Sequence, residues 1–220
     1  MIWQARFAPE RIIMNSLDMR LNPLFHRSEF DTDGFFELPV INRVNLNDEI
    51  IRMIPLSKTK RNDSDEHCRF GVHCFEDDYR LTALYNNPER ALDKLMQYAF
   101  ICTPDYSTYS DMDVWRQLES VAHSRWVGAY WQKHGITVIP TVSWSDKRSF
   151  LFCFDSIERG SDIAVGTIGC KHSKKSFLYG YDAMLEKLAP KKVFCVGKPF
   201  DEMRGNVIAI SDEYPRRAVC

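Results

Sequence analysis

The chain has 220 residues, of which 45% are hydrophobic and 27% are charged, with 10 glycines and 10 prolines. This composition is typical of a folded globular protein and excludes collagen-like, coiled-coil and largely disordered classes. Because 29 Lys and Arg oppose 30 Asp and Glu, the net charge is -1, so binding to nucleic acid or to an anionic membrane would need a local basic patch.

The N-terminal sequence carries charges at Arg6, Glu10 and Arg11, and it contains no apolar stretch of signal-peptide length. No window of the chain is apolar for long enough to span a bilayer. The seven cysteines are odd in number, and several lie in apolar runs, where a free thiol acts as a small hydrophobe. We therefore expect a cytoplasmic protein with reduced thiols and no membrane contact.

Residues 1–66 have an irregular pattern. Residues 35–41 form a short apolar run that could be a strand, and Pro39 would place it at the edge of a sheet. Residues 57–66, SKTKRNDSDE, are almost all charged or hydroxyl-bearing, which is typical of a solvated loop. We therefore predict an N-terminal extension over residues 1–66 and an α/β domain over residues 67–220.

Helical periodicity appears three times in the α/β domain. The first helix begins at Asn87-Pro88 and continues to about residue 99, the second covers residues 112–133, and the third covers residues 176–188. Gly135 follows the second helix in a position typical of a helix stop.

Short apolar runs separate these helices and predict strands. They cover residues 100–102, 136–142, 162–168, 192–196 and 207–210. Residues 149–157 fit a short helix or a strand almost equally well. Because the strands alternate with helices and are apolar throughout, we predict an α/β fold with a mainly parallel sheet covered on both faces, either doubly wound or a partial β/α barrel.

A parallel sheet of this kind binds ligands beyond the carboxyl ends of its strands, where loops and helix N-termini meet. Polar side chains and one indole follow four of the predicted strands. They are Asp105 and Ser107 after residues 100–102, Trp144 after 136–142, Lys171 and His172 after 162–168, and Lys198 after 192–196.

Lys171, His172 and Lys198 predict a phosphate-binding site. A basic loop that leads into a helix N-terminus favours anions, although the P-loop spacing is absent and a solvated charged turn is the simpler alternative. Asp105 could act as a general base or as a ligand of a divalent metal. Trp144 could stack on a base or a sugar, or it could cover the core.

A zinc site has two of the required ligand types. His67-Cys68 and His73-Cys74 could combine with Cys170 and His172, but the C-x2-C spacing of zinc knuckles is missing, so we assign no metal site. Trp115, Trp126, Tyr130 and Trp131 lie at helical spacing and are expected to pack in the interior, or to face a partner together with Arg116 and Arg125.

The middle of the chain resembles a family of bacterial, phage and mobile-element proteins that is catalogued as a domain of unknown function, number four-four-one-seven. The resemblance covers about residues 70–197. Its motifs are FEDDYRLTALYNNPERAL (75–92), TPDYSTYSDM (103–112), GAYWQKHGITVIPTVSW (128–144), SFLFCFDSI (149–157) and AVGTIGCK (164–171). The family has no established activity. The resemblance implies a prokaryotic or phage setting, and it places Asp105, Ser107, Trp144 and Asp155 inside shared motifs.

From these observations we expect a protein that binds a phosphorylated ligand, either a nucleotide or a nucleic-acid backbone, with hydrolysis left open. Asp105, Ser107 and Asp155 are the catalytic candidates, and Trp144, Lys171, His172 and Lys198 are the ligand-binding candidates. The alternative is a non-enzymatic phage or mobile-element factor that binds a host protein through an exposed aromatic patch. A third hypothesis is glycosyl chemistry between Asp105 and either Asp146 or Asp155. Neither the substrate nor the oligomeric state follows from the sequence.

Overall fold

The computed structural model describes residues 29–47 and 51–210. The chain divides into two compact units, Met1–Phe30 and Asp31–Cys220, and the description below concerns the second unit. The irregular pattern predicted for residues 1–28 lies outside the described residues.

Seven short strands of the second unit run parallel and follow one another in chain order. A first sheet contains β3 (Met53–Pro55), β4 (Gly71–His73), β5 (Phe100–Cys102) and β6 (Val138–Ile139), and a second contains β7 (Ile163–Gly166), β8 (Val193–Val196) and β9 (Val207–Ile210). A parallel bridge between Thr141 and Ala164 joins the two sheets. The predicted parallel α/β fold is therefore confirmed, and the unbroken order of the strands is that of a β/α barrel.

The inward side chains of these strands form one apolar core. It contains Met53, Phe75, Phe100, Cys102, Ile139, Ala164, Phe194, Val196 and Ile210. The Phe100 ring of β5 lies 6.1 Å from the Phe194 ring of β8, so the strands curl around a shared interior. Gly71 and Gly166 make room for this packing, because a Cβ at Gly71 would lie 2.1 Å from the Phe100 ring and one at Gly166 would lie 2.7 Å from Phe75. The interior is filled and forms no pore. No pairing joins β3 to β9 within the described ranges, so the barrel is partial.

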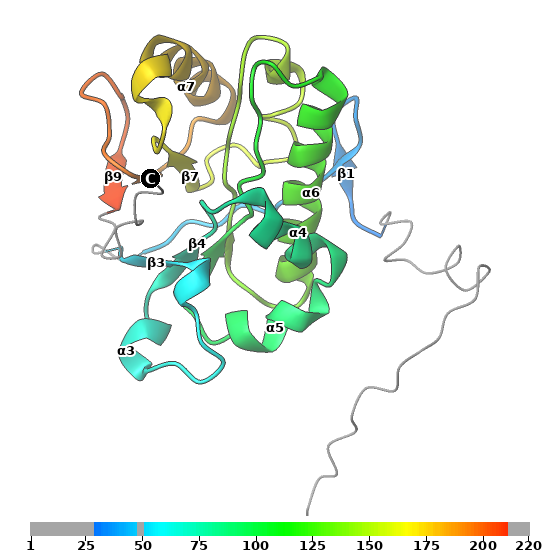
Figure 1. The fold of residues 1–220 in the computed structure, drawn as a ribbon, viewed down its shortest axis with the longest axis vertical. Coiled ribbons are helices and arrows are strands. Elements are labelled where there is room, and N and C mark those ends of the chain that lie inside the picture. Colours follow the sequence, from blue (N-terminus) through cyan, green and yellow to red (C-terminus); the bar gives the residue numbers. More distant parts are fainter. Residues whose placement is uncertain (1–28, 48–50, 211–220) are drawn as a thin grey trace, which may run out of the picture. The chain divides into compact units, whose positions relative to one another are not determined.

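Helices cover the outside of the strands. They are α3 (Asp65–Cys68), α4 (Asp78–Asn86), α5 (Glu89–Leu95), α6 (Val114–Lys133) and α7 (Lys174–Leu188), with short 3-10 turns η1 (Leu56–Lys58), η2 (Ser149–Leu151) and η3 (Cys170–Ser173). Figure 1 shows α6 and α7 on different sides of the strands. A second apolar core lies beneath these two helices and includes Val121 of α6, Tyr181 and Met184 of α7, and the outward Val165 and Cys195.

The predicted helices are confirmed with small shifts at their ends. Helix α6 ends as predicted, and Gly135 beyond it has φ +84°, the left-handed conformation that glycine adopts most easily. The five predicted strands are all present, although β6 is only two residues long. Residues 149–157 contain the 3-10 turn η2 and no strand.

Some elements lie where no pattern indicated them. Strand β3 belongs to the parallel sheet although it falls within the predicted extension, and β4 and α4 had no recognised signal. Residues 35–41 contribute Leu38–Pro39 (β2), which pairs antiparallel with Thr32–Asp33 (β1). Arg52 and His73 interrupt the apolar runs of β3 and β4, which explains why these two strands escaped prediction.

Candidate functional site

The carboxyl ends of the seven strands meet at one rim, because all adjacent pairs run parallel. The loops after β4, β5, β6, β7 and β8 build this rim. Six of the seven candidate residues lie in these loops, namely Asp105, Ser107, Trp144, Lys171, His172 and Lys198.

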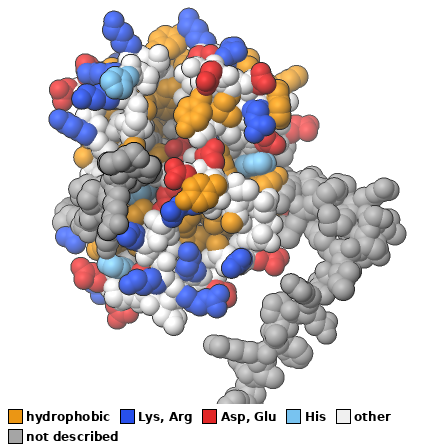
Figure 2. Space-filling model, in the orientation of Figure 1, with side chains coloured by type: hydrophobic (Ala, Val, Ile, Leu, Met, Phe, Trp, Pro, Cys, Tyr) orange, Lys and Arg blue, Asp and Glu red, His pale blue; other side chains and the backbone are white. Residues whose placement is uncertain are grey.

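The loops after β7 and β8 form a basic part of the rim. Lys171 and His172 lie in η3 and are exposed, and Lys198 is exposed in the next loop. The Thr167 hydroxyl donates a hydrogen bond of 2.9 Å to the Lys198 carbonyl and so ties the two loops together. Figure 2 shows basic side chains and histidine gathered at the upper left, over the yellow segment of Figure 1 that contains η3.

The backbone of the same two loops adds hydrogen-bond donors. Gly169 and Gly197 have φ values of +79° and +101°. No described residue accepts a hydrogen bond from the backbone N–H groups of Ile168, Gly169 or Lys198. Helix α7 begins directly after η3, and no Ser173 side-chain bond caps its first turn. N–H groups at a helix N-terminus favour an anion, so the basic side chains and the backbone attract the same kind of group.

Asp105 lies on this rim close to η3. Its backbone N–H donates to the Cys74 carbonyl at 3.3 Å, which ties the loop after β5 to the end of β4. The pKa of the Cys170 thiol is raised first by burial and then by the negative charge of Asp105. Because Cys170 directly precedes Lys171, this carboxylate lies within electrostatic reach of the basic loop.

Ser107 is held by a carboxylate that the sequence analysis did not select. Asp78, the first residue of α4, accepts hydrogen bonds of 3.1 Å from both the backbone N–H and the hydroxyl of Ser107. The Ser120 hydroxyl donates to the Ser107 carbonyl at 2.8 Å. These bonds lock the loop after β5 to α4 and α6. Asp78 falls in a shared family motif, and that motif was its only signal in the sequence.

Trp144 packs against α7. Its ring lies 5.1 Å from the Phe177 ring and 6.1 Å from Phe154, and a Cβ at Gly180 would lie 2.2 Å from the indole. Of the two alternatives given for Trp144, this half-buried packing fits the one in which the indole covers the core.

Asp155 lies away from the rim. Its carboxylate forms an ion pair of 2.9 Å with Lys187, in the last turn of α7. Helix α7 has 15 residues, about 22 Å of helix, and η3 precedes its first turn. The charge of Asp105 thus acts on Cys170 at the start of η3, whereas Asp155 lies at the far end of α7.

Arg125 of α6 is the largest polar side chain in the interior. It is 2% exposed, and its guanidinium donates to the backbone carbonyls of Thr141 (3.2 Å), Cys153 (2.7 Å) and Asp155 (3.2 Å). Burial lowers its pKa from 12.5 to about 10. This residue therefore holds the segments after β6 together. The hypothesis that Arg125 faces a partner is wrong, because its side chain is buried.

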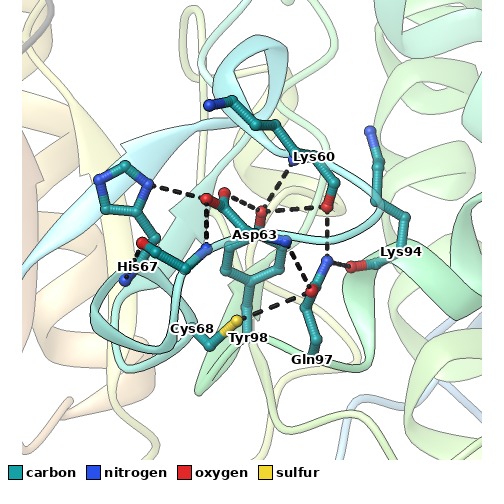
Figure 3. Close-up of polar contacts among 8 residues, drawn as sticks. Lys60, Asp63, His67, Cys68, Lys94, Gln97 and Tyr98 are labelled. Atoms are coloured by element: carbon teal, nitrogen blue, oxygen red, sulfur yellow. Dashed lines mark hydrogen bonds and ion pairs between the residues drawn. The ribbon is translucent and has the colours of Figure 1, made fainter.

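A polar cluster also joins the predicted solvated loop to the residues that follow α5 (Figure 3). The Asp63 carboxylate accepts from the Tyr98 hydroxyl at 2.7 Å, and it lies 3.0 Å from Nδ1 of His67. The hydrogen bond from Tyr98 is the main cause that lowers the pKa of Asp63. Gln97 adds bonds to the Lys60 and Lys94 carbonyls, so this loop is pinned to the fold.

The described residues contain no group of three or more His, Cys, Asp or Glu side chains arranged to bind a metal. His67 lies on α3 beside Asp63, and His73 is 3% exposed in β4. Among the described residues, the pairs His67-Cys68 and His73-Cys74 thus do not come together as a group of metal ligands.

A surface groove of about 550 Å³ is lined mainly by residues of α7. Its walls are Phe150, Tyr179, Asp182, Ala183, Leu185, Glu186 and Arg204. Within the described ranges, no helix combines the length and the apolar character needed to cross a bilayer.

Comparison with known proteins gives one family and two phage relatives. The family model described as a domain of unknown function (DUF4417) matches residues 30–215. The "Gene 1 protein" of Mycobacterium phage L5 is 40% identical over 130 residues, which make up 58% of this chain and 57% of the phage protein. The "Gene 1 protein" of Mycobacterium phage D29 is 36% identical over 130 residues, 58% of this chain and 48% of that protein. The chain thus spans about half the length of these curated relatives. No solved structure matches the chain significantly.

Proposed function

The chain belongs to the DUF4417 family, and we propose that this phage-type protein binds a phosphorylated ligand, a nucleotide or a nucleic-acid backbone, at the carboxyl ends of β7 and β8. One observation carries the proposal. Two loops that are tied together by the Thr167 hydroxyl present Lys171, His172 and Lys198 to solvent, next to the first turn of α7.

The two lysines would neutralise the phosphate charge, and the backbone N–H groups of Gly169 and Lys198 would donate to its oxygens. Charge-assisted hydrogen bonds of this kind are the strong ones in proteins, and η3 and α7 supply them from a fixed backbone. His172 would add a donor in its protonated form.

Hydrolysis would need a base or a metal ligand beside the phosphate. Two carboxylates lie near η3: the charge of Asp105 acts on Cys170, and Glu202 pairs with Lys174 at 2.8 Å. We assign either role to Asp105, because Glu202 is already engaged. Ser107 would help to position the loop after β5, because Asp78 engages its hydroxyl. We assign no role in hydrolysis to Asp155, which pairs with Lys187 at the far end of α7. We assign no ligand contact to Trp144, whose indole packs against Gly180.

We also propose the cytoplasm as the compartment. All six described cysteines are free, and burial is the main cause that raises the pKa of Cys153 to about 12 and of Cys195 to about 11. Free thiols in a stable interior suit a reducing compartment.

Titration calorimetry with inorganic phosphate, mononucleotides and a short single-stranded oligonucleotide, with and without Mg²⁺, tests the proposal. Replacing Lys171 or Lys198 by Gln should weaken phosphate binding about 10- to 100-fold each. Lys191→Gln is the matched control, since Lys191 is exposed just before β8, at the opposite end of that strand. Absence of heat across the panel, or equal losses in all three variants, would refute phosphate binding at this rim.

A further inference from the structure

The part of the rim at the beginning of α4 and α6 differs in character from the basic loops. Tyr79, Tyr109 and Trp115 are 71%, 64% and 60% exposed. We call these three rings and the carboxylates next to them in the sequence the acidic aromatic surface; the carboxylates are Asp77, Asp78, Asp111, Asp113 and Glu119. From their size and exposure, the rings present roughly 400 Å² to solvent, as large as the main apolar patch of a typical monomer.

Hydrogen bonds connect two parts of this surface, the start of α4 and the loop after β5. The Ser107 hydroxyl lies 3.1 Å from an Asp78 oxygen and 3.3 Å from the Tyr109 hydroxyl, so the loop after β5 lies against the start of α4. Trp115 and Glu119 are four residues apart in α6 and lie on the same face of the helix. In Figure 2, acidic and hydrophobic side chains lie side by side in the middle of the visible face, where α4 begins in Figure 1.

Two of the rings are held in place by arginines. The Arg80 guanidinium lies 5.4 Å from the centre of the Tyr79 ring, and its Nε donates to the Tyr79 hydroxyl at 2.8 Å. Arg116 lies 5.2 Å from the centre of the Trp115 ring. Such contacts restrict the rings before any partner arrives, which lowers the entropy lost on binding.

The charge of the surface selects the kind of partner. Residues 77–80 and 109–119 contain five carboxylates and two arginines, and both arginines lie over the rings. Arg148 also reaches this part, since it donates to the Ser110 carbonyl at 3.0 Å, but Asp146 pairs with it at 2.8 Å. Phosphate groups would be repelled by this excess of negative charge. Lys and Arg side chains would pair with the carboxylates, while their aliphatic parts and neighbouring apolar residues would cover the rings.

We propose that the acidic aromatic surface docks a basic segment of a partner protein. Exposed Tyr and Trp are the residue types that dominate binding energy at protein interfaces, and the surrounding carboxylates supply the charge complementarity. This interaction goes beyond phosphate binding, and it uses a different part of the rim.

Fluorescence anisotropy with a labelled peptide of alternating Arg and Leu tests the proposal. The peptide should bind the full chain in the micromolar range, and its affinity should fall as salt is added. The same peptide with Glu in place of Arg should not bind. Equal binding of the acidic peptide, or no binding of the basic one, would overturn the proposal. So would displacement of the basic peptide by a single-stranded oligonucleotide from this surface.

Variants locate the binding site of the peptide. Trp115→Ala should weaken binding about 30-fold, as expected for the loss of a central aromatic contact. Asp111→Asn combined with Glu119→Gln should weaken binding and flatten its salt dependence. Tyr179→Ala is the matched control, because this ring is 53% exposed on α7, outside the surface. Equal effects of Trp115→Ala and Tyr179→Ala would refute the assignment.

Discussion

Replacing Arg125 by Met should destabilise the fold by about 2 to 5 kcal/mol. Met fills a similar volume but cannot donate to the carbonyls of Thr141, Cys153 and Asp155. Three hydrogen bonds from a charged donor contribute roughly 4 to 9 kcal/mol in total. Against this stands the cost of burying the charge. The lowering of the Arg125 pKa from 12.5 to about 10 corresponds to about 3 kcal/mol.

Urea denaturation followed by circular dichroism measures the difference in unfolding free energy. For a folded unit of this size, the expected loss lowers the melting temperature by roughly 5 to 15 °C. Arg125→Lys, which keeps the charge with fewer donors, should lose less than Arg125→Met.

Arg116→Met is the control, because Arg116 lies exposed on the same helix and its replacement should change stability by no more than about 0.5 kcal/mol. A variant Arg125→Met that is as stable as the original chain would refute the reasoning. It would mean that the desolvation cost of the guanidinium cancels its three hydrogen bonds, as happens when some buried ionic groups are replaced by apolar ones.

Three further predictions concern other parts of the fold. Because the folded-state pKa of Asp63 is lowered from its ordinary value of 3.8, its ionised form stabilises the protein above pH 3.8, and this contribution is lost as the pH falls further. The stability difference between the original chain and Asp63→Asn, measured by urea denaturation, should therefore shrink from pH 7 toward pH 3; a constant difference would contradict it. Gly71→Ala should cost about 1 to 3 kcal/mol because its Cβ would overlap the Phe100 ring, and Phe100→Leu should recover part of this loss in thermal melts. Iodoacetamide labelling read by mass spectrometry should modify Cys170, which is half-buried, before Cys153, which is fully buried with a pKa of about 12.

The sequence predicted those parts of the fold that have a long pattern. Helix α6 was predicted because its apolar residues recur over twenty positions and Gly135 ends it. The β-branched runs around Ile163 and Val193 identified β7 and β8, because strands buried on both faces are apolar throughout. The direction of the strands followed from their alternation with helices, and with it the location of the rim.

The choice between a barrel and a doubly wound sheet could not be made from the sequence. It depends on pairs such as Gly71 with Phe100 and Gly166 with Phe75, where a missing side chain on one strand admits a ring from another segment. Such complementarity links distant positions and leaves no local pattern. Strands β3 and β4 were missed because Arg52 and His73 interrupt their apolar runs, whereas β5, of the same length, has an uninterrupted run.

The candidate site was predicted unevenly because strand ends locate loops but do not orient side chains. Lys171 and Lys198 are exposed on adjacent loops, as the strand-end argument requires. Asp155 was selected from a shared motif alone, and its partner is Lys187 at the far end of α7. Asp78 was not selected as a candidate, although its carboxylate accepts hydrogen bonds from Ser107. Its position in a charged run gave no sign of this contact.

The two proposed sites on the rim are built from separate loops, which makes them independently testable. Lys171 and Lys198 follow β7 and β8, whereas Tyr79 and Trp115 lie at the beginnings of α4 and α6, the helices that come after β4 and β5. Substitutions at distant positions that share no partners add in free energy. The Lys171→Gln variant should therefore keep its affinity for the basic peptide, and Trp115→Ala should keep its affinity for phosphate. If each variant instead lost affinity for both phosphate and the basic peptide, the rim would be a single site. A single ligand would then have to contact both the basic and the acidic part of the rim.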